Sequence, residues 1–421
     1  MKLGRFLSFA LACALLAGAA RAQATWIVDD DGGPGVHFTD IQPAIDAASA
    51  GDVIRVFPGS YNGFTLDKHL VVAGQPGAPA FVNGTSSIRN IVAPGKVVVS
   101  RLAALSWQLS NCAGAILLDD CEGGVFGTSP AQDGLTATGC ADLRIQRSSY
   151  SGKDYWSSSM TPGGAGIRLS KSRLQVNHAW VRGGQGAVGN YGHCNGYPGG
   201  AGIVGWESNI HVYGSSIYGG MGGEDFPSPG CGWGGIGGDG GPAVTTAPAS
   251  VLAAGPASLV LKGGPGGYGA AGGGKPGNGI TCYGDVRLPP PNANIGTVFT
   301  LGGGTVQIPD PPDPTLSFKT PQPIAGEPLR FMIHGPQDAI VTLLVGREPV
   351  LVAPTALKER RLVSLDQDRA PVGVIDASGE LITKIEIPAS APHGFTFLAQ
   401  AELVYPDGET RYTNSLTVVL P

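Results

Sequence analysis

The sequence "GGAGIRLSKSRLQVNHAWVRGG" (163–184) recurs as "GGAGIVGWESNIHVYGSSIYGG" (199–220). Looser copies begin at Gly240 and Gly277. One apolar residue anchors each copy, and neighbouring anchors are 36, 41 and 36 residues apart: Ile167, Ile203, Val244 and Ile280. A short strand pattern that recurs at near-constant spacing is typical of a solenoid, in which each unit buries its apolar face against the next.

The segment before these copies carries a helix signal followed directly by a strand signal. In "TWIVDDDGGPGVHFTDIQPAIDAASAGDVIRVFPGSYNGFTL" (25–66), Thr39 or Asp40 can cap a short helix that ends at Gly51. The apolar side of this helix is predicted to consist of Ile41, Ala44, Ile45 and Ala48. A strand of apolar residues then begins at Val53 and is broken by Pro58.

This segment resembles the N-terminal cap and first coil of the right-handed parallel β-helix, or pectin-lyase-like, superfamily. The family pattern is a short "I-Q-x-A-I-x-x-A" helix followed by "G-D-x-I-x-V-x-P-G-x-Y". It stands here as Ile41, Gln42, Ala44, Ile45, Ala48, Gly51, Asp52, Ile54, Val56, Pro58, Gly59 and Tyr61. The resemblance covers about residues 25–305 and implies that the helix closes the open end of the solenoid, where apolar interior and unpaired backbone would otherwise be exposed.

The composition predicts an N-terminal leader for export, followed by two domains. Residues 1–24 have a basic start and an apolar run that ends in small residues, which predicts a cleaved signal peptide. Residues 25–307 are expected to form the β-helix, with glycine-rich insertions at roughly 183–200, 219–242 and 262–278. A proline-rich linker (308–328) and a C-terminal β-sandwich (329–421) follow, the latter with a hairpin at Pro406-Asp407-Gly408. The predicted fold class is therefore all-β.

Charge and hydropathy restrict the partners. Without Lys2, Arg5 and Arg21 of the leader, 24 basic residues face 32 acidic ones, a formal charge of −8. A mildly acidic chain without basic runs is a poor candidate for binding nucleic acid or anionic membranes. Beyond the leader, no segment is long and apolar enough to span a bilayer. We expect a secreted, periplasmic or cell-surface protein.

Six cysteines remain after the leader, and an even count in an exported chain predicts disulfides. Cys194 lies 27 residues after Ile167, and Cys231 lies 28 residues after Ile203. The two cysteines therefore hold nearly the same place in consecutive repeats, and Cys194–Cys231 is the preferred bridge. The sequence leaves the pairing of the other four open: Cys112, Cys121, Cys140 and Cys282.

Cleavage of a polysaccharide would require particular catalytic residues. The hydrolase signatures "N-T-D", "G-H-G" and "R-I-K" of the pectin-lyase-like superfamily are absent from the sequence, as is the pectate-lyase string "W-x-D-H". Lyase chemistry needs carboxylates for calcium and a basic group, and hydrolysis needs paired carboxylic acids. The best candidates lie on adjoining coils before the repeats: Asp120, Asp142, Arg144 and Lys153. Asp119 and Asp120 are adjacent, so on a strand they would point to opposite faces.

Two further patterns suggest ligands. "YSGKDYWSSSM" (150–160) places Tyr150, Tyr155 and Trp156 where a coil should turn, and an exposed platform of these rings could stack on sugars. The alternative is that the rings are buried under their own loop. "GGIGGDG" (234–240) matches the start of a repeat-in-toxin calcium pattern with Asp239, but a single good copy is better explained by glycine-rich composition. No cofactor is expected, and calcium is the only ion that these patterns suggest.

Three hypotheses of function follow from these patterns, and we favour the first. The first is a non-catalytic protein that binds a polysaccharide, a cell-surface glycan or a protein partner through stacked loops and an aromatic patch. The second is a polysaccharide lyase or glycoside hydrolase that acts on an acidic polysaccharide. A purely structural spacer is the third reading.

Overall fold

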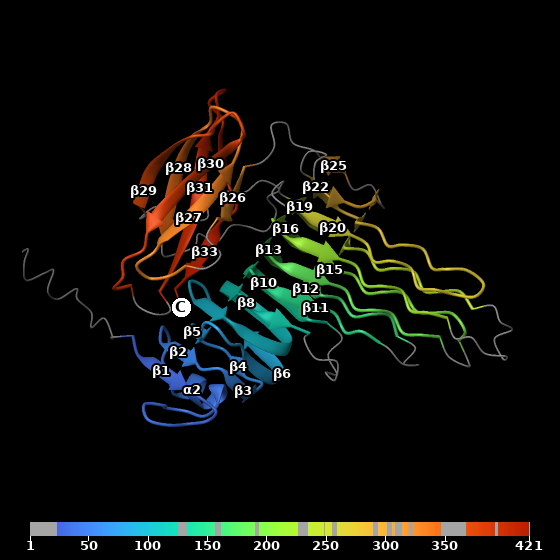
Figure 1. The fold of residues 1–421 in the computed structure, drawn as a ribbon, viewed down its shortest axis with the longest axis horizontal. Coiled ribbons are helices and arrows are strands. Elements are labelled where there is room, and N and C mark those ends of the chain that lie inside the picture. Colours follow the sequence, from blue (N-terminus) through green and yellow to red (C-terminus); the bar gives the residue numbers. More distant parts are fainter. Residues whose placement is uncertain are drawn as a thin grey trace, which may run out of the picture.

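The computed structural model describes the chain in these ranges: 23–124, 133–155, 161–189, 193–225, 235–247, 249–254, 259–288, 294–300, 305–307, 314–319, 323–346, 368–391 and 395–420. Parallel strands wind into a solenoid from the first described residues to β25, and an antiparallel sandwich from β26 to β33 packs on one of its faces (Figure 1). The predicted fold class, a parallel β-helix followed by a β-sandwich, is confirmed.

The solenoid has three parallel sheets, and most coils contribute one strand to each. Sheet I contains β1 (Thr25–Val28), β2 (Val53–Val56), β5 (Val71–Gly74), β7 (Lys96–Ser100), β13 (Arg173–Asn177), β16 (Asn209–Tyr213), β19 (Val251–Ala254), β22 (Asp285–Arg287) and β25 (Val306–Gln307). Sheet II contains β3 (Gly59–Asn62), β9 (Glu122–Gly123), β11 (Ser149–Ser151), β14 (Trp180–Arg182), β17 (Ser216–Tyr218), β20 (Val260–Lys262) and β23 (Asn294–Ile295).

Sheet III contains β4 (Thr65–Leu66), β12 (Ile167–Ser170), β15 (Ile203–Trp206), β18 (Val244–Thr246), β21 (Ile280–Cys282) and β24 (Val298–Thr300). Three long strands run through the corners between sheets: β6 (Ala80–Arg89), β8 (Leu102–Asp119) and β10 (Leu135–Gln146).

The anchoring residues of the sequence repeat form one column of the core. Ile203 pairs in register with Ile167 and Val244, and Val244 pairs with Ile280. All four side chains are fully buried. The spacing of 36, 41 and 36 residues is therefore the length of one coil, as the solenoid hypothesis requires.

The helix α2 (Ile41–Ala47) closes the N-terminal end of the core, as the resemblance implies. Asp40 is its N-cap, because the carboxylate accepts a hydrogen bond from the backbone N–H of Ile41 at 2.8 Å. The predicted apolar side is buried against the first coils and consists of Ile41, Ala44, Ile45 and Ala48.

Glycine-rich excursions leave the solenoid after sheet II and return to sheet III, forming two layers of extended chain (Figure 1). Within one layer the hydrogen bonds recur every third residue: Gly183, Gly186 and Gly189 donate to the carbonyls of Tyr218, Met221 and Glu224 at 2.9–3.0 Å. A three-residue period is that of the polyproline II helix, which makes no internal hydrogen bonds. The backbone N–H and C=O groups of the excursions therefore form their hydrogen bonds with neighbouring segments.

Hydrogen bonds also join the two layers, and they explain why glycine is needed. The Gly200 N–H donates to Gly184 O at 2.8 Å, and the Gly220 N–H donates to Gly200 O at 2.7 Å. A Cβ atom on Gly220 would lie 1.9 Å from Gly184 O. Only a residue without a side chain fits where main chains approach this closely.

The C-terminal domain is a sandwich of two antiparallel sheets. One contains β26 (Thr315–Phe318), β27 (Pro328–His334) and β30 (Glu380–Glu386). The other contains β28 (Ile340–Gly346), β29 (Asp368–Val374), β31 (Thr396–Val404), β32 (Thr410–Tyr412) and β33 (Leu416–Val419). β26 lies inside the range 308–328 that was expected to be a linker. Leu316 of this strand is buried and pairs with Ile333, so the sandwich begins within that range.

The strand β33 attaches the sandwich to the outer face of sheet I. The Gln146 side-chain amide hydrogen-bonds both the N–H and the carbonyl of Thr417, as a neighbouring strand would. Val419 packs on Val98 and Leu117, and the Asn414 side chain donates to Asn177 Oδ1 at 3.0 Å. Sheet I is therefore covered by the sandwich from the coil of Val98 to the coil of Asn177.

We predict that Gly220→Ala lowers the free energy of unfolding by about 1–3 kcal/mol, as overpacking typically does. The matched control is Gly273→Ala in the same bundle, since the nearest atom to its added Cβ lies at 3.4 Å. Urea denaturation followed by circular dichroism measures both variants. Equal midpoints for the two variants would contradict the close packing described above.

Candidate functional site

The predicted catalytic residues do not share one surface. The Arg144 guanidinium makes two hydrogen bonds to the Asp142 carboxylate, at 3.0 and 2.8 Å, and a third to Ser415 Oγ at 2.9 Å. Both side chains are less than a tenth exposed, because the sandwich covers them. Asp120 instead pairs with Arg101, and Lys153 Nζ lies 5.4 Å from the ring centroid of Tyr155. The structure brings Asp142 and Arg144 together beneath the domain interface, and it gives Asp120 and Lys153 other partners.

A charged corner lies where sheet I turns toward sheet II. Fully buried Asp119 accepts two hydrogen bonds from the Arg147 guanidinium, whose carbon lies 5.0 Å from the ring centroid of Phe318. Asp120 takes φ +54°, so the regular alternation of side chains ends at this residue. The expectation of opposite faces applied to a strand, but β8 ends at Asp119; Asp119 is buried against Arg147, whereas Asp120 is partly exposed and pairs with Arg101. Burial, and then the neighbouring Asp119 carboxylate, raise the pKa of Asp120.

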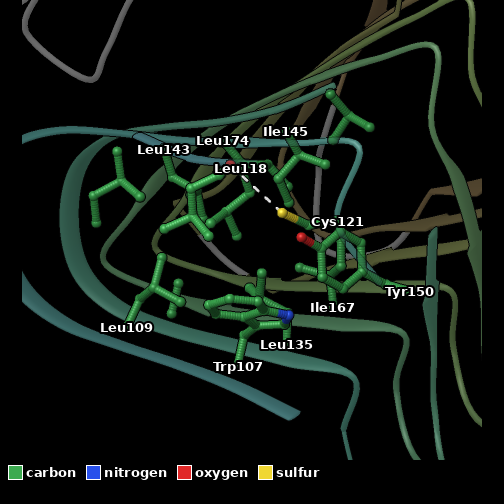
Figure 2. Packing of buried hydrophobic residues seen from close by; sticks show 14 of the residues in the cluster. Trp107, Leu109, Leu118, Cys121, Leu135, Leu143, Ile145, Tyr150, Ile167 and Leu174 are labelled. Carbon is green, nitrogen blue, oxygen red and sulfur yellow. Dashed lines mark hydrogen bonds between the residues drawn. The ribbon is translucent and has the colours of Figure 1, made fainter. Parts of the chain in front are cut away.

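The prediction that Tyr150 belongs to an exposed aromatic platform is wrong. Tyr150 is fully buried and lies inside the coil beside Cys121, near Trp107 (Figure 2). It pairs in register with the core residue Val181, so the side chain occupies an inward position. Tyr155 is half-buried, and Trp156 lies outside the described residues.

Two aromatic rings instead lie on sheet II in the next two coils, where Trp180 is exposed and Tyr218 is half-buried. The Trp180 side chain is 40% exposed, and its ring centroid lies 6.4 Å from that of Tyr218 on the next coil. Trp180 pairs in register with Ser149 on one side and Ser216 on the other. A ring thus stands between two hydroxyl-bearing positions on the outer face.

A shallow depression of about 400 Å³ adjoins this ring, and its lining includes Arg147, Ser149, His178, Trp180 and Ser216. Burial, and then the nearby Arg147 charge, lower the pKa of His178. The imidazole is therefore neutral at pH 7, with one nitrogen to donate and one to accept. We call the set Ser149, His178, Trp180, Ser216 and Tyr218 the Trp180 site.

Two features of the neighbouring coils fix the Trp180 site. Gly214 has φ +52°, and a Cβ atom there would lie 2.8 Å from His178 Cε1, so the glycine makes room for the imidazole. Arg182 donates to Asp154 Oδ2 at 2.8 Å, and Asp154 Oδ1 also accepts the backbone N–H of Gln185 at 2.7 Å. The site is therefore built on rigid strands with its flanking charges already paired.

The sequence offered a signal for this site that was missed. In the two clear repeat copies, Val181 and Ile217 are the buried residues of β14 and β17. Alternation along a strand then points Trp180 and Tyr218 outward. The same alternation applied to Tyr150, which shares their column, would have placed that ring inside.

The remaining predicted residues have structural partners or lie outside the described residues. The Asp239 carboxylate accepts the backbone N–H of Lys275 at 2.7 Å and so joins two glycine-rich excursions. Cys194 is disulfide-bonded; its predicted partner Cys231 lies outside the described residues, so this pairing stays a prediction. Four described cysteines have free thiols in this structure and lie in the core, so the predicted disulfides of these residues are not shown: Cys112, Cys121, Cys140 and Cys282.

Comparison with protein-family models and with curated proteins finds no match for the chain. Within the described ranges, no helix has the length and apolar character needed to cross a membrane. The functional assignment therefore depends on the geometry of the site.

We predict that Asp120→Asn raises the denaturation midpoint at pH 7. Because the pKa of Asp120 is raised in the folded state, ionisation costs stability as the pH rises from the unfolded pKa, about 3.9, through the folded value. Asparagine removes this cost and tolerates a positive φ. The two proteins should converge below about pH 3.

The matched control is Asp119→Asn, which removes the partner of Arg147 and should lower the midpoint at pH 7. Thermal denaturation across pH 3–7 measures all three proteins. A lower midpoint for Asp120→Asn at pH 7 would show that the corner favours the ionised carboxylate.

Proposed function

We propose that the chain is an exported, non-catalytic protein of the pectin-lyase-like superfamily that binds a polysaccharide or cell-surface glycan at the Trp180 site. The observation that carries the proposal is the exposed Trp180 ring, which packs near half-buried Tyr218 and lies beside a depression lined with hydroxyl and imidazole groups. Sugars present an apolar face of C–H groups and a rim of hydroxyls, so an aromatic ring with polar neighbours is complementary to them.

The direction of the site suggests how a chain of sugars would lie. Trp180 and Tyr218 belong to successive coils, so the rings follow one another along the solenoid axis. Ser149 on the preceding coil and Ser216 on the following coil each pair in register with Trp180. A glycan that runs parallel to the axis would meet a ring or a hydroxyl at each coil.

The surrounding charges favour binding over chemistry. Glycoside hydrolysis needs two free carboxyl groups on either side of the bond, and lyase action needs a free base. Each of four carboxylates in the described coils is paired with an arginine: Asp119, Asp133, Asp142 and Asp154. The oxygens of a carboxylate in such a pair are occupied by the guanidinium, so it is not available to flank a substrate.

One observation favours the alternative, a polysaccharide lyase or glycoside hydrolase acting on an acidic polysaccharide. The raised pKa of Asp120 is the property expected of a general acid, and its neighbour Asp119 binds Arg147, which lines the depression. Incubation with a panel of polysaccharides and calcium tests this reading. New reducing or unsaturated ends that vanish in Asp120→Asn would establish the alternative and remove the non-catalytic assignment.

The binding proposal predicts that Trp180→Ala weakens glycan binding at least about tenfold, because a truncated aromatic anchor typically costs 2 kcal/mol or more. Affinity electrophoresis in the polysaccharides that retain the wild-type protein is the measurement. The matched control is Trp206→Ala, since Trp206 is 54% exposed but lies on sheet III. Binding that is lost equally in both variants, or in neither, would contradict the assignment of the site.

A further inference from the structure

Two buried cysteines face each other on successive coils. Cys112 of β8 pairs in register with Cys140 of β10. Both side chains are at most 1% exposed, and both thiols are free. Neighbouring strands of a sheet lie about 4.7–4.9 Å apart, and disulfides need Cα atoms about 4.4–6.8 Å apart. Main-chain pairing alone thus places these residues at bridging distance.

The two thiols also affect each other's pKa. The neighbouring Cys140 thiol lowers the pKa of Cys112 to about 7, and the Cys112 thiol raises the pKa of Cys140. Each thiol donates a hydrogen bond to a carbonyl of its own strand, Cys112 to Ser110 O at 3.2 Å and Cys140 to Thr138 O at 3.7 Å. The two residues are therefore coupled across successive coils.

The other two free cysteines of the described core differ in this respect. Cys121 lies in the core against Tyr150, and burial raises the pKa of its thiol (Figure 2). Cys282 pairs in register with Thr246 and Thr300, and its sulfur contacts the carbonyl of Gly284. These two residues serve as internal controls in the same core.

We propose that Cys112 and Cys140 form a disulfide that joins two successive coils of the solenoid. The oxidant is a small disulfide such as oxidised glutathione. The Cys112 thiolate attacks it and releases one glutathione thiolate, and the Cys140 thiolate then displaces the second from the mixed disulfide. Two protein thiols lose two protons and two electrons, and one glutathione disulfide becomes two thiols.

Burial determines when this reaction takes place. Neither sulfur is accessible once the coils have stacked, so the bond forms during folding, as is usual for exported chains in an oxidising compartment. The bond closes a loop between residues 112 and 140, which restricts the unfolded chain and stabilises the folded one. The proposal is independent of the Trp180 site and of glycan binding.

The test is to refold the mature chain with a glutathione redox buffer or with a phosphine reductant, and then to alkylate it in denaturant. Peptides are mapped by mass spectrometry without reduction. The expected result in the redox buffer is a Cys112–Cys140 cross-linked peptide, with Cys121 and Cys282 alkylated. Full alkylation of Cys112 and Cys140, or their pairing with other cysteines, overturns the proposal.

A second measurement separates this bond from the disulfide at Cys194. Oxidation should raise the urea midpoint of the wild type more than that of Cys140→Ser, since both keep Cys194. The matched variant Cys121→Ser should retain the full wild-type shift. An equal shift in the wild type and in Cys140→Ser contradicts a bond between the two coils.

Discussion

Main-chain hydrogen bonds between successive coils are the constraint on which the rest of the molecule depends. In the sheets they hold Ile167, Ile203, Val244 and Ile280 in one column. In the excursions they continue every third residue, and glycine is required because the layers approach too closely for a side chain. The bundle begins where sheet II ends, since Gly183 donates to the carbonyl of Tyr218. The hydrogen bonding that builds the bundle therefore also fixes the strand that carries Tyr218 on sheet II.

The sequence predicted what depends on local spacing and failed where distant segments meet. The coil length and the capping helix were readable from the apolar anchors and from Asp40. Of the four predicted catalytic residues, Asp142 and Arg144 lie together, but the residue that contacts Arg144 from the sandwich, Ser415, lies 271 residues away in the sequence. The positive φ of Asp120 has no signal in the sequence, because the matching corners of the next coils carry Arg147, His178 and Gly214. Tyr150 was misplaced because its coil lacks the clear repeat that reveals which positions point inward.

Domain packing decides which face of the solenoid is available for function. The sandwich covers sheet I with β33 and buries its polar side chains in pairs such as Gln146 with Thr417. Sheet II keeps the rings of Trp180 and Tyr218 on its outer face. The glycine-rich bundle extends this face outward and carries side chains such as Gln185 and Met221 between its glycines. Binding at sheet II is thus consistent with the fold, the charges and the distribution of aromatic residues.

The glycine-rich excursions form a hydrogen-bonded bundle that is continuous with the sheets. Amide hydrogen exchange of the intact protein, resolved by NMR, measures this directly. We expect slow exchange for the amides that join the layers, among them Gly184, Gly200, Gly220 and Gly241. Exchange of these amides at the rate of an unstructured chain would contradict the bundle and the support it gives to the Trp180 site.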